Sequence, residues 1–360
     1  MIANVVEKLA ERQAKSIANR LAKRVVRNLI LAVIIAALPL GNSASAETTA
    51  PETAAPASPA TTAQTTPAPA TTAPATLVRG TRVSINKTDN FSAAPNFSGF
   101  IDKATQSSIM VTEMPSPFEA TTAGFNQEGL ASRSMKLVSK EAITVGDYPG
   151  ILCSVKQTAY GTDFSKWILA FGDKDRTIVV TASFPDSEAE KLSASLKQTL
   201  LSARYDSKAQ PPDPMADLPF TISGSKTLLM AGRIQNTLLF SPTGKITAID
   251  PKDHSLFLVG QALNDIDIPD KADFARTRLK MTANLTDVQI LSEKDITVSG
   301  MPTREILASG KNKQGDELFV LQDIAYGGGS YFFLQGITDL DQKAEKEPEF
   351  KAIVESFKLK

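Results

Sequence analysis

The chain has 360 residues, of which 39 are Lys or Arg, 39 are Asp or Glu, one is His and one is Cys. This length allows two ordinary domains, and the single cysteine and single histidine exclude an intrachain disulfide and a Cys/His zinc cluster. The charge is unevenly distributed, because the chain after residue 46 keeps 32 basic and 37 acidic residues. Nothing in this balance predicts a nucleic-acid partner.

The first 46 residues have the order of a secretory signal peptide. Residues 1–28 contain seven Lys or Arg, an apolar run follows over 29–40, and residues 42–46 are small. Twelve apolar residues are too few for a membrane-spanning helix, which needs about 20. We therefore expect export, with cleavage after Ala46 and with Ala44 as the other small residue of the cleavage motif. The long basic region leaves an uncleaved membrane anchor as the alternative to a free periplasmic or extracellular form.

Residues 47–80 are predicted to be a disordered linker. Between residues 47 and 76 the chain has ten Ala, ten Thr and six Pro, and no apolar side chain larger than these. Such a segment buries too little apolar surface to fold, and its prolines favour an extended chain. It is either a stalk that holds the folded part away from a membrane or wall, or a solvated tail.

The rest of the chain contains two similar halves. Ser139–Pro149 matches Ser292–Pro302 at an offset of 153 residues, and both segments contain Ile-Thr-Val. In each half a strand and a helical stretch precede this segment, and three β-rich runs and an amphipathic helix follow it. The preceding elements are expected at 108–112 and 117–132 in the first half, and at 255–259 and 269–283 in the second. Self-similarity over this length indicates two copies of one domain.

Each half is predicted to be an α+β domain. Short turns such as 172–176 join consecutive strands, which favours antiparallel pairing. The first closing helix starts at a capping-box pattern, Ser187 and Glu190, and Asp270 is expected to cap the helix over 269–283. The buried helix positions are expected to be Leu192, Leu196 and Leu200 in the first half and Phe350, Ile353, Val354 and Phe357 in the second. We expect two tandem α/β/α sandwich domains over 81–206 and 220–360, joined by a proline-rich linker over 207–219.

Several short motifs carry a family resemblance. They are Phe97-Ser-Gly-Phe100, Thr112-Glu-Met-Pro115, Phe171-Gly-Asp173 and the closing helix Phe350–Phe357. With the order of elements, they make the chain resemble the PsbP/Mog1/DcrB-like superfamily, over most of 81–206 and more weakly over 215–360. The resemblance implies an antiparallel sheet between helices, and binding or scaffolding rather than a common reaction. It transfers no functional residue to this chain.

The sequence motifs predict no catalytic residue, no cofactor and no metal site. His254 lies in a turn before a strand and is interpreted as an exposed turn residue rather than a base. Cys153 shares a strand face with Ile151 and Val155, which predicts a buried thiol. The segment Gly224–Thr227 lacks the spacing of a phosphate-binding loop, and no dinucleotide motif occurs.

Three residues are surface candidates. Trp167 lies on a strand, where an aromatic contact with a ligand is one interpretation and core packing is the favoured one. Asp173 and Asp175 flank Lys174 in a hairpin turn, where a cation site is weighed against solvated turn residues.

The first functional hypothesis is a non-enzymatic envelope protein whose two PsbP-like domains bind or scaffold an envelope protein. The alternatives are a carrier of a small ligand held between sheet and helices, and a hydrolase that uses only carboxylates. Because the first half keeps the family-like motifs, we expect it to carry the binding surface and the second half to be structural. Basic residues form no dense run after residue 28, so no nucleic-acid partner is expected.

Overall fold

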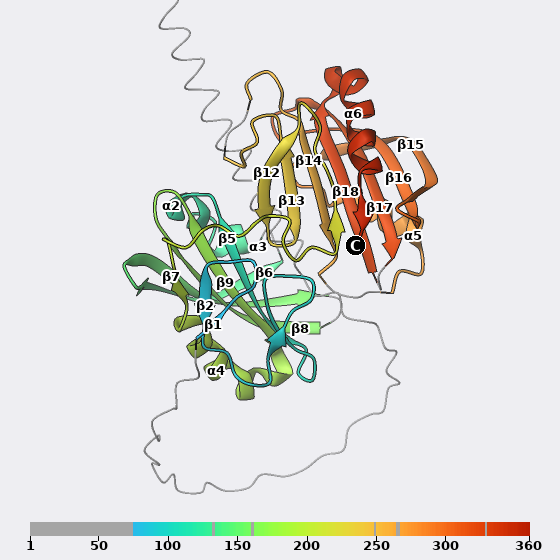
Figure 1. The fold of residues 1–360 in the computed structure, drawn as a ribbon. Helices are drawn as coiled ribbons and strands as arrows, with labels where there is room; N and C mark the ends of the chain where they lie inside the picture. Colours follow the sequence, from blue (N-terminus) through green and yellow to red (C-terminus); the bar gives the residue numbers. More distant parts are fainter. Residues whose placement is uncertain (1–74, 132–133, 160–161, 248–249, 264–266, 328–329) are drawn as a thin grey trace, which may run out of the picture.

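The computed structural model describes residues 75–360 apart from 132–133, 160–161, 248–249, 264–266 and 328–329 (Figure 1). The predicted signal peptide, Ala44, Ala46 and most of the predicted linker lie outside these residues. Among the helices that the structure describes, none is long and apolar enough to cross a membrane.

The first half forms a seven-stranded antiparallel sheet with the order β3-β4-β5-β9-β8-β7-β6. Its strands are β3 (Ser92–Ala93), β4 (Gly99–Asp102), β5 (Ser107–Met114), β6 (Met135–Val145), β7 (Tyr148–Ala159), β8 (Thr162–Gly172) and β9 (Thr177–Pro185). Its helices are α2 (Phe118–Thr122), α3 (Gln127–Ala131) and α4 (Ala189–Leu201).

The second half repeats this arrangement, with the order β12-β13-β14-β18-β17-β16-β15. Its strands are β12 (Leu229–Ile234), β13 (Thr237–Ser241), β14 (Leu256–Gln261), β15 (Thr286–Val298), β16 (Met301–Lys311), β17 (Glu317–Gly327) and β18 (Ser330–Asp339). Its helices are α5 (Lys271–Lys280) and α6 (Lys343–Glu355).

In each half, a small sheet pairs a strand near the start with a strand near the end. In the first, β2 (Val83–Ile85) pairs with β1 (Thr76–Leu77) and β10 (Arg204–Tyr205). In the second, β11 (Phe220–Thr221) pairs with β19 (Lys358–Leu359). Strand β1 and the fully buried Val78 lie before residue 81, the predicted start of the first domain.

Helices cover both faces of each sheet. In the first domain α4 packs on one face through Leu192, Leu196 and Leu200, and Phe125 and Leu130 of the α2–α3 region pack on the other. In the second domain α6 and α5 cover opposite faces. The predicted fold class is therefore confirmed as two tandem α+β domains, each with an antiparallel sheet between helices.

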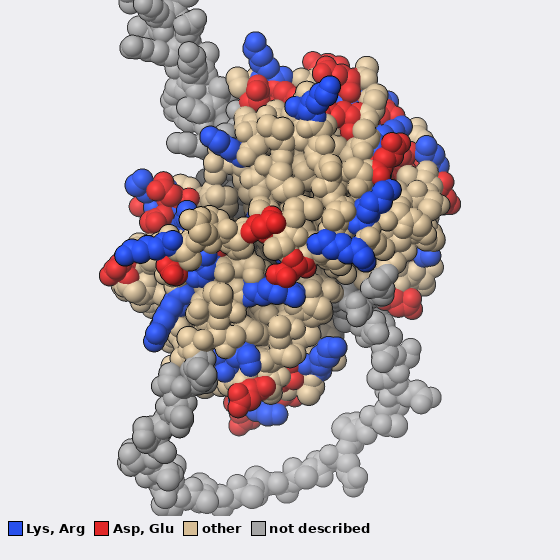
Figure 2. Space-filling model, in the orientation of Figure 1, with Lys and Arg blue, Asp and Glu red and all other residues tan. Residues whose placement is uncertain are grey.

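The two domains share one apolar cluster. Ile234, Leu239 and Leu258 of the second sheet pack with the face of the first sheet that carries Cys153 and Ile168. Burying apolar side chains from both domains in one cluster fixes their relative position (Figure 1). On the face seen in Figure 2, positive and negative side chains are interspersed over both domains.

The helical stretch predicted over 117–132 is divided in two, and the predicted capping box at Ser187 is wrong. The stretch 117–132 forms two short helices because the chain turns at 123–126, where Asn126 Oδ1 accepts a 2.8 Å hydrogen bond from the Gly129 N–H and starts α3. The Ser187 capping box does not form either, because a 3₁₀ turn over Asp186–Glu188 leads into α4, which has no side-chain cap. The predicted cap of α5 is confirmed, since Asp270 Oδ1 accepts a 2.8 Å hydrogen bond from the Asp273 N–H.

Candidate functional site

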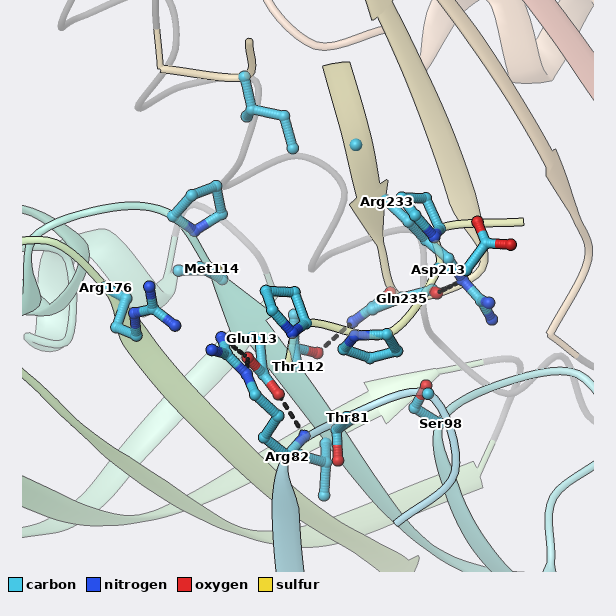
Figure 3. A pocket seen from close by; sticks show the side chains of 18 of the residues that line it. Thr81, Arg82, Ser98, Thr112, Glu113, Met114, Arg176, Asp213, Arg233 and Gln235 are labelled. Atoms are coloured by element: carbon cyan, nitrogen blue, oxygen red, sulfur yellow. Dashed lines mark hydrogen bonds and ion pairs between the residues drawn. The ribbon is translucent and has the colours of Figure 1, made fainter. Parts of the chain in front are cut away.

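A cleft of about 250 Å³ lies where the two domains and their connecting segment meet (Figure 3). Its lining comes from the β1–β2 turn, β5, the β8–β9 turn, β12 and residues 211–214. The lining is mostly apolar, with Val111, Met114, Pro115, Pro211, Pro212 and Pro214 contributing. The proline-rich segment between the domains is thus a wall of the cleft.

An ion pair between Arg82 and Glu113 lies in the middle of the cleft (Figure 3). Arg82 Nη2 and Nε donate to Glu113 Oε2 at 2.6 and 3.1 Å, and the Arg82 backbone N–H donates to Oε1 at 2.5 Å. Both side chains are mostly buried. Three charge-assisted bonds hold the Glu113 carboxylate in place.

Arg176 lies on the first-domain side of the cleft. One of its guanidinium nitrogens donates to the hydroxyl of Tyr205, whose ring also lies 5.1 Å from the guanidinium carbon of Arg82. Burial raises the pKa of Tyr205, so the phenol stays neutral at physiological pH. Within the described chain Arg176 forms no ion pair.

Arg233 and Gln235 form the second-domain side. Arg233 Nε donates to the Gln235 carbonyl at 2.6 Å and Nη1 to the Ala216 carbonyl at 2.8 Å. Burial lowers the pKa of Arg233, the charge of Asp217 opposes this effect, and the charge of Arg79 adds to it. Gln235 Nε2 donates to Thr112 Oγ1 at 3.2 Å, so a hydrogen bond crosses from one domain to the other beside the cleft.

The three predicted surface candidates have different environments. Trp167 is partly buried against α4, where its Nε1 donates to the Ser193 carbonyl at 3.1 Å, so it packs in the core as the favoured interpretation has it. Asp173 Oδ1 accepts the backbone N–H of Asp175 and Arg176 at 2.8 and 2.9 Å. Burial opposes ionisation of Asp173, but these donors outweigh it and its pKa lies below the ordinary value. Of these three candidates, only Asp175 is among the residues that line the cleft, and it lies at the rim.

The residues weighed for chemistry lie away from the cleft. Cys153 is fully buried, and burial raises the pKa of its thiol. His254 Nδ1 lies 2.9 Å from Asp339 Oδ2 on an exposed turn. In the part of the chain that the structure describes, no three His, Cys, Asp or Glu side chains are placed to hold a metal ion.

Sequence reasoning missed the cleft. Its arginines are separated by 94 and 57 residues, at Arg82, Arg176 and Arg233, and they form no motif. The prolines at 211–214 gave the only signal, and they were interpreted as a linker. Residues of both halves line the candidate site, whereas we expected the binding surface in the first half.

No protein-family model and no curated protein matches the chain. Solved structures with similar folds include Mog1p, the Ran-binding protein of Saccharomyces cerevisiae, at 11% identity, covering 41% of this chain and 93% of Mog1p with a TM-score of 0.31. They also include LpqN of Mycobacterium tuberculosis, involved in cell envelope biogenesis, at 17% identity, covering 42% of this chain and 87% of LpqN with a TM-score of 0.30.

A third similar structure spans both domains. The type VI secretion immunity protein TplEi of Pseudomonas aeruginosa is 11% identical, and the match covers 80% of this chain and 98% of TplEi with a TM-score of 0.29. At these identities and TM-scores the matches carry no argument about this chain.

Proposed function

We propose that the protein is an exported, non-enzymatic binding protein of the cell envelope, and that its ligand site is the cleft between the two domains. The observation that carries the proposal is the cleft itself, because one open cleft combines apolar walls with polar groups from two domains. Ligand sites are typically concave, mostly apolar and equipped with a few polar groups, and domain interfaces are a common place for them. A volume of about 250 Å³ is slightly below the usual range of ligand pockets, about 300–1,000 Å³, so the cleft suits a small fragment or one peptide side chain.

The carboxylates favour binding over hydrolysis. A carboxylate-only hydrolase needs two acids that face each other across a cleft about 5–9 Å apart. Glu113 in this cleft is held by Arg82, and Asp175 forms an ion pair with Lys174 at 3.0 Å. Glu305 and Asp323 pair across neighbouring strands, but they are buried and do not line the cleft.

The test is an NMR titration of the isotope-labelled protein with a panel of neutral, cationic and anionic fragments of benzene-ring size. At least one fragment is expected to shift the amide signals of Thr112 and Gln235 together, because these residues lie on opposite sides of the domain junction. Shifts spread over the surface, or none at these two residues for any fragment, would contradict the proposal.

The exported location has its own test, because it is supported by residues 1–46 alone. Cell fractionation followed by N-terminal sequencing is expected to find the protein outside the cytoplasm with Glu47 as its first residue. A protein that keeps Met1 and partitions with the membrane would instead support the uncleaved anchor.

A further inference from the structure

One end of the cleft brings two hydrogen-bond donors, Ser98 and Arg233, close to Gly80. Gly80 has φ +74°, in the left-handed region that favours glycine, and a Cβ added to it would lie 3.1 Å from Ser98 Oγ and 4.0 Å from Arg233 Nη1. Ser98 Oγ and Arg233 Nη1 therefore both lie near the side of Gly80 that a side chain would occupy. Figure 3 places Ser98 and Arg233 on the same side of the cleft, and both line it.

Both donors have hydrogen-bonding capacity to spare. Ser98 is only 5% exposed, and its hydroxyl has no hydrogen-bond partner in the described part of the chain. Arg233 uses Nε and Nη1 on carbonyl groups, while its Nη2 has no such partner there. An anion beside Gly80 would accept hydrogen bonds from both groups and would add its charge to that of Asp217, which already acts on the half-buried Arg233.

The nearby acids are occupied elsewhere. Glu113 is held by Arg82. Asp217 lies 3.9 Å from Arg79 and is half-exposed. Asp213 lines the rim and accepts the backbone N–H of Met215 at 2.9 Å. Asp217 acts on Arg233 at a distance, but none of the ion pairs within the described residues joins an acid to Arg233, so its Nη2 is available to a ligand.

The rest of the cleft is apolar next to this end. Pro211, Pro212 and Pro214 form one wall, and Val111 and Met114 of β5 lie on the other side. Proline has a fixed φ and loses little entropy on ordering, so this wall is preorganised for an apolar group. The ligand that fits both parts has an anionic group at one end and a compact apolar body.

We propose that Ser98 and Arg233 bind the carboxylate of a small ligand beside Gly80, while its apolar body lies against the proline wall. This inference rests on the proposed function of the cleft and names the ligand class. Carboxylates suit a guanidinium and a hydroxyl because both donors form charge-assisted hydrogen bonds with them.

The experiment compares 3-phenylpropionate with its neutral isostere 3-phenylpropionamide, by NMR titration of the purified exported protein. The carboxylate is expected to bind at least about tenfold more tightly, because hydrogen bonds to charged groups are the strong ones. It is also expected to shift the amide signals of Gly80 and Ser98. Inorganic phosphate, titrated separately, shows whether the subsite accepts an anion without an apolar body.

The variants Ser98→Ala and Arg233→Gln are each expected to weaken phenylpropionate binding about tenfold or more and to leave the binding of the amide unchanged. Arg204→Gln is the matched control, because Arg204 is an exposed arginine of the first domain that does not line the cleft. It is expected to change the affinity less than twofold. Amide spectra of the free variants verify that each one is folded.

The outcomes separate the two proposals. Equal binding of the acid and the amide in the cleft would overturn the anion subsite and leave the cleft as a ligand site. An equal loss of affinity in Arg204→Gln and Arg233→Gln would also overturn the subsite, because it would show general surface electrostatics. If no fragment shifts the signals of the cleft, the proposed function itself fails.

Discussion

The two domains share a fold and differ beneath the helix that closes each of them. In the first domain Leu152 of β7 pairs with Leu169 of β8, and both are fully buried against α4. At the equivalent place in the second domain, Glu305 of β16 pairs with Asp323 of β17, and both are buried. At the 153-residue offset between the halves, Glu305 is the sequence equivalent of Leu152. The fold therefore needs a buried pair at this point, but it does not need charge there.

The carboxylates are poorly compensated. Neither oxygen of Asp323 has a hydrogen-bond partner, and Lys294 Nζ lies 3.2 Å from Glu305 Oε1 without the geometry of a hydrogen bond. Burial, and then the Glu305 charge, raise the pKa of Asp323 to about 8, against the weaker opposing effect of Lys294 and Lys351. Asp323 is therefore mostly protonated at neutral pH.

A second difference lies one helix turn into each closing helix. Leu192 is the fourth residue of α4, and Lys346 is the fourth residue of α6. Lys346 is also buried, but its Nζ lies 2.7 Å from Asp253 Oδ2 and 3.1 Å from Glu349 Oε2. The second domain thus contains one well-paired buried charge and one poorly paired acid, where the first has leucines. The two cases predict opposite effects of substitution.

The largest effect is expected for Lys346→Met, which breaks the paired charge. Removing one partner of a buried ion pair leaves the others desolvated and costs about 3–5 kcal/mol of stability. Urea unfolding followed by circular dichroism measures this loss. The control is Lys351→Met on the same helix, because Lys351 pairs with Glu347 near the surface, and such pairs contribute about 0.3–0.5 kcal/mol. Equal losses in the two variants would contradict the distinction.

The double substitution E305L/D323L installs the leucine pair of the first domain in the second. Replacing buried charged groups with apolar side chains of similar volume is often stabilising, by about 1–4 kcal/mol. The same unfolding measurement is expected to show a higher midpoint at pH 8. The reciprocal variant L152E/L169D is expected to lower it, and a destabilised E305L/D323L would mean that the carboxylates have a structural role after all.

The pH dependence of stability tests the Asp323 proton directly. The folded protein keeps this proton up to about pH 8, whereas the unfolded chain loses it near the ordinary value of 3.8. Stability is therefore greatest below the lower value and falls as pH rises towards the upper one, by up to ~1.4 kcal/mol per pH unit. The groups that act on this site are Glu305, Lys294 and Lys351.

The difference between the wild-type protein and Asp323→Asn isolates this contribution, because asparagine does not titrate. We expect wild type to lose stability relative to this variant between pH 5 and pH 8, and the difference to level off above pH 8. Urea unfolding at one-unit pH intervals measures it. A constant difference over this range would show that Asp323 is ionised in the folded protein at every pH tested.

The sequence predicted the parts of the fold that depend on periodicity. Leu192, Leu196 and Leu200 are buried as their spacing indicates, and so is Cys153, since alternation along a strand assigns its face. The internal repeat predicted two copies of one domain, and the two sheets have the same strand order. These features are local or repeated, so they are visible in one sequence.

The features that depend on long-range contacts could not be predicted in this way. Nothing in the spacing of Ile234, Leu239 and Leu258 shows that another domain, rather than a helix, covers them. The cleft forms only after this docking brings Arg233 near Ser98. For Glu305 and Asp323 the sequence likewise predicts exposed side chains, because acidic residues are rarely buried.

The smallest expected effect compares the starts of two helices. Asp270 caps α5 through the Asp273 N–H, whereas α4 begins from a 3₁₀ turn in which Ser187 is exposed and caps nothing. Asp270→Ala is therefore expected to cost about 1 kcal/mol, and Ser187→Ala to stay within ~0.5 kcal/mol of wild type. Urea unfolding of both variants checks this. A loss for Ser187→Ala as large as that for Asp270→Ala would restore the capping box that the sequence predicted, because only a side-chain cap at Ser187 gives the alanine variant such a cost.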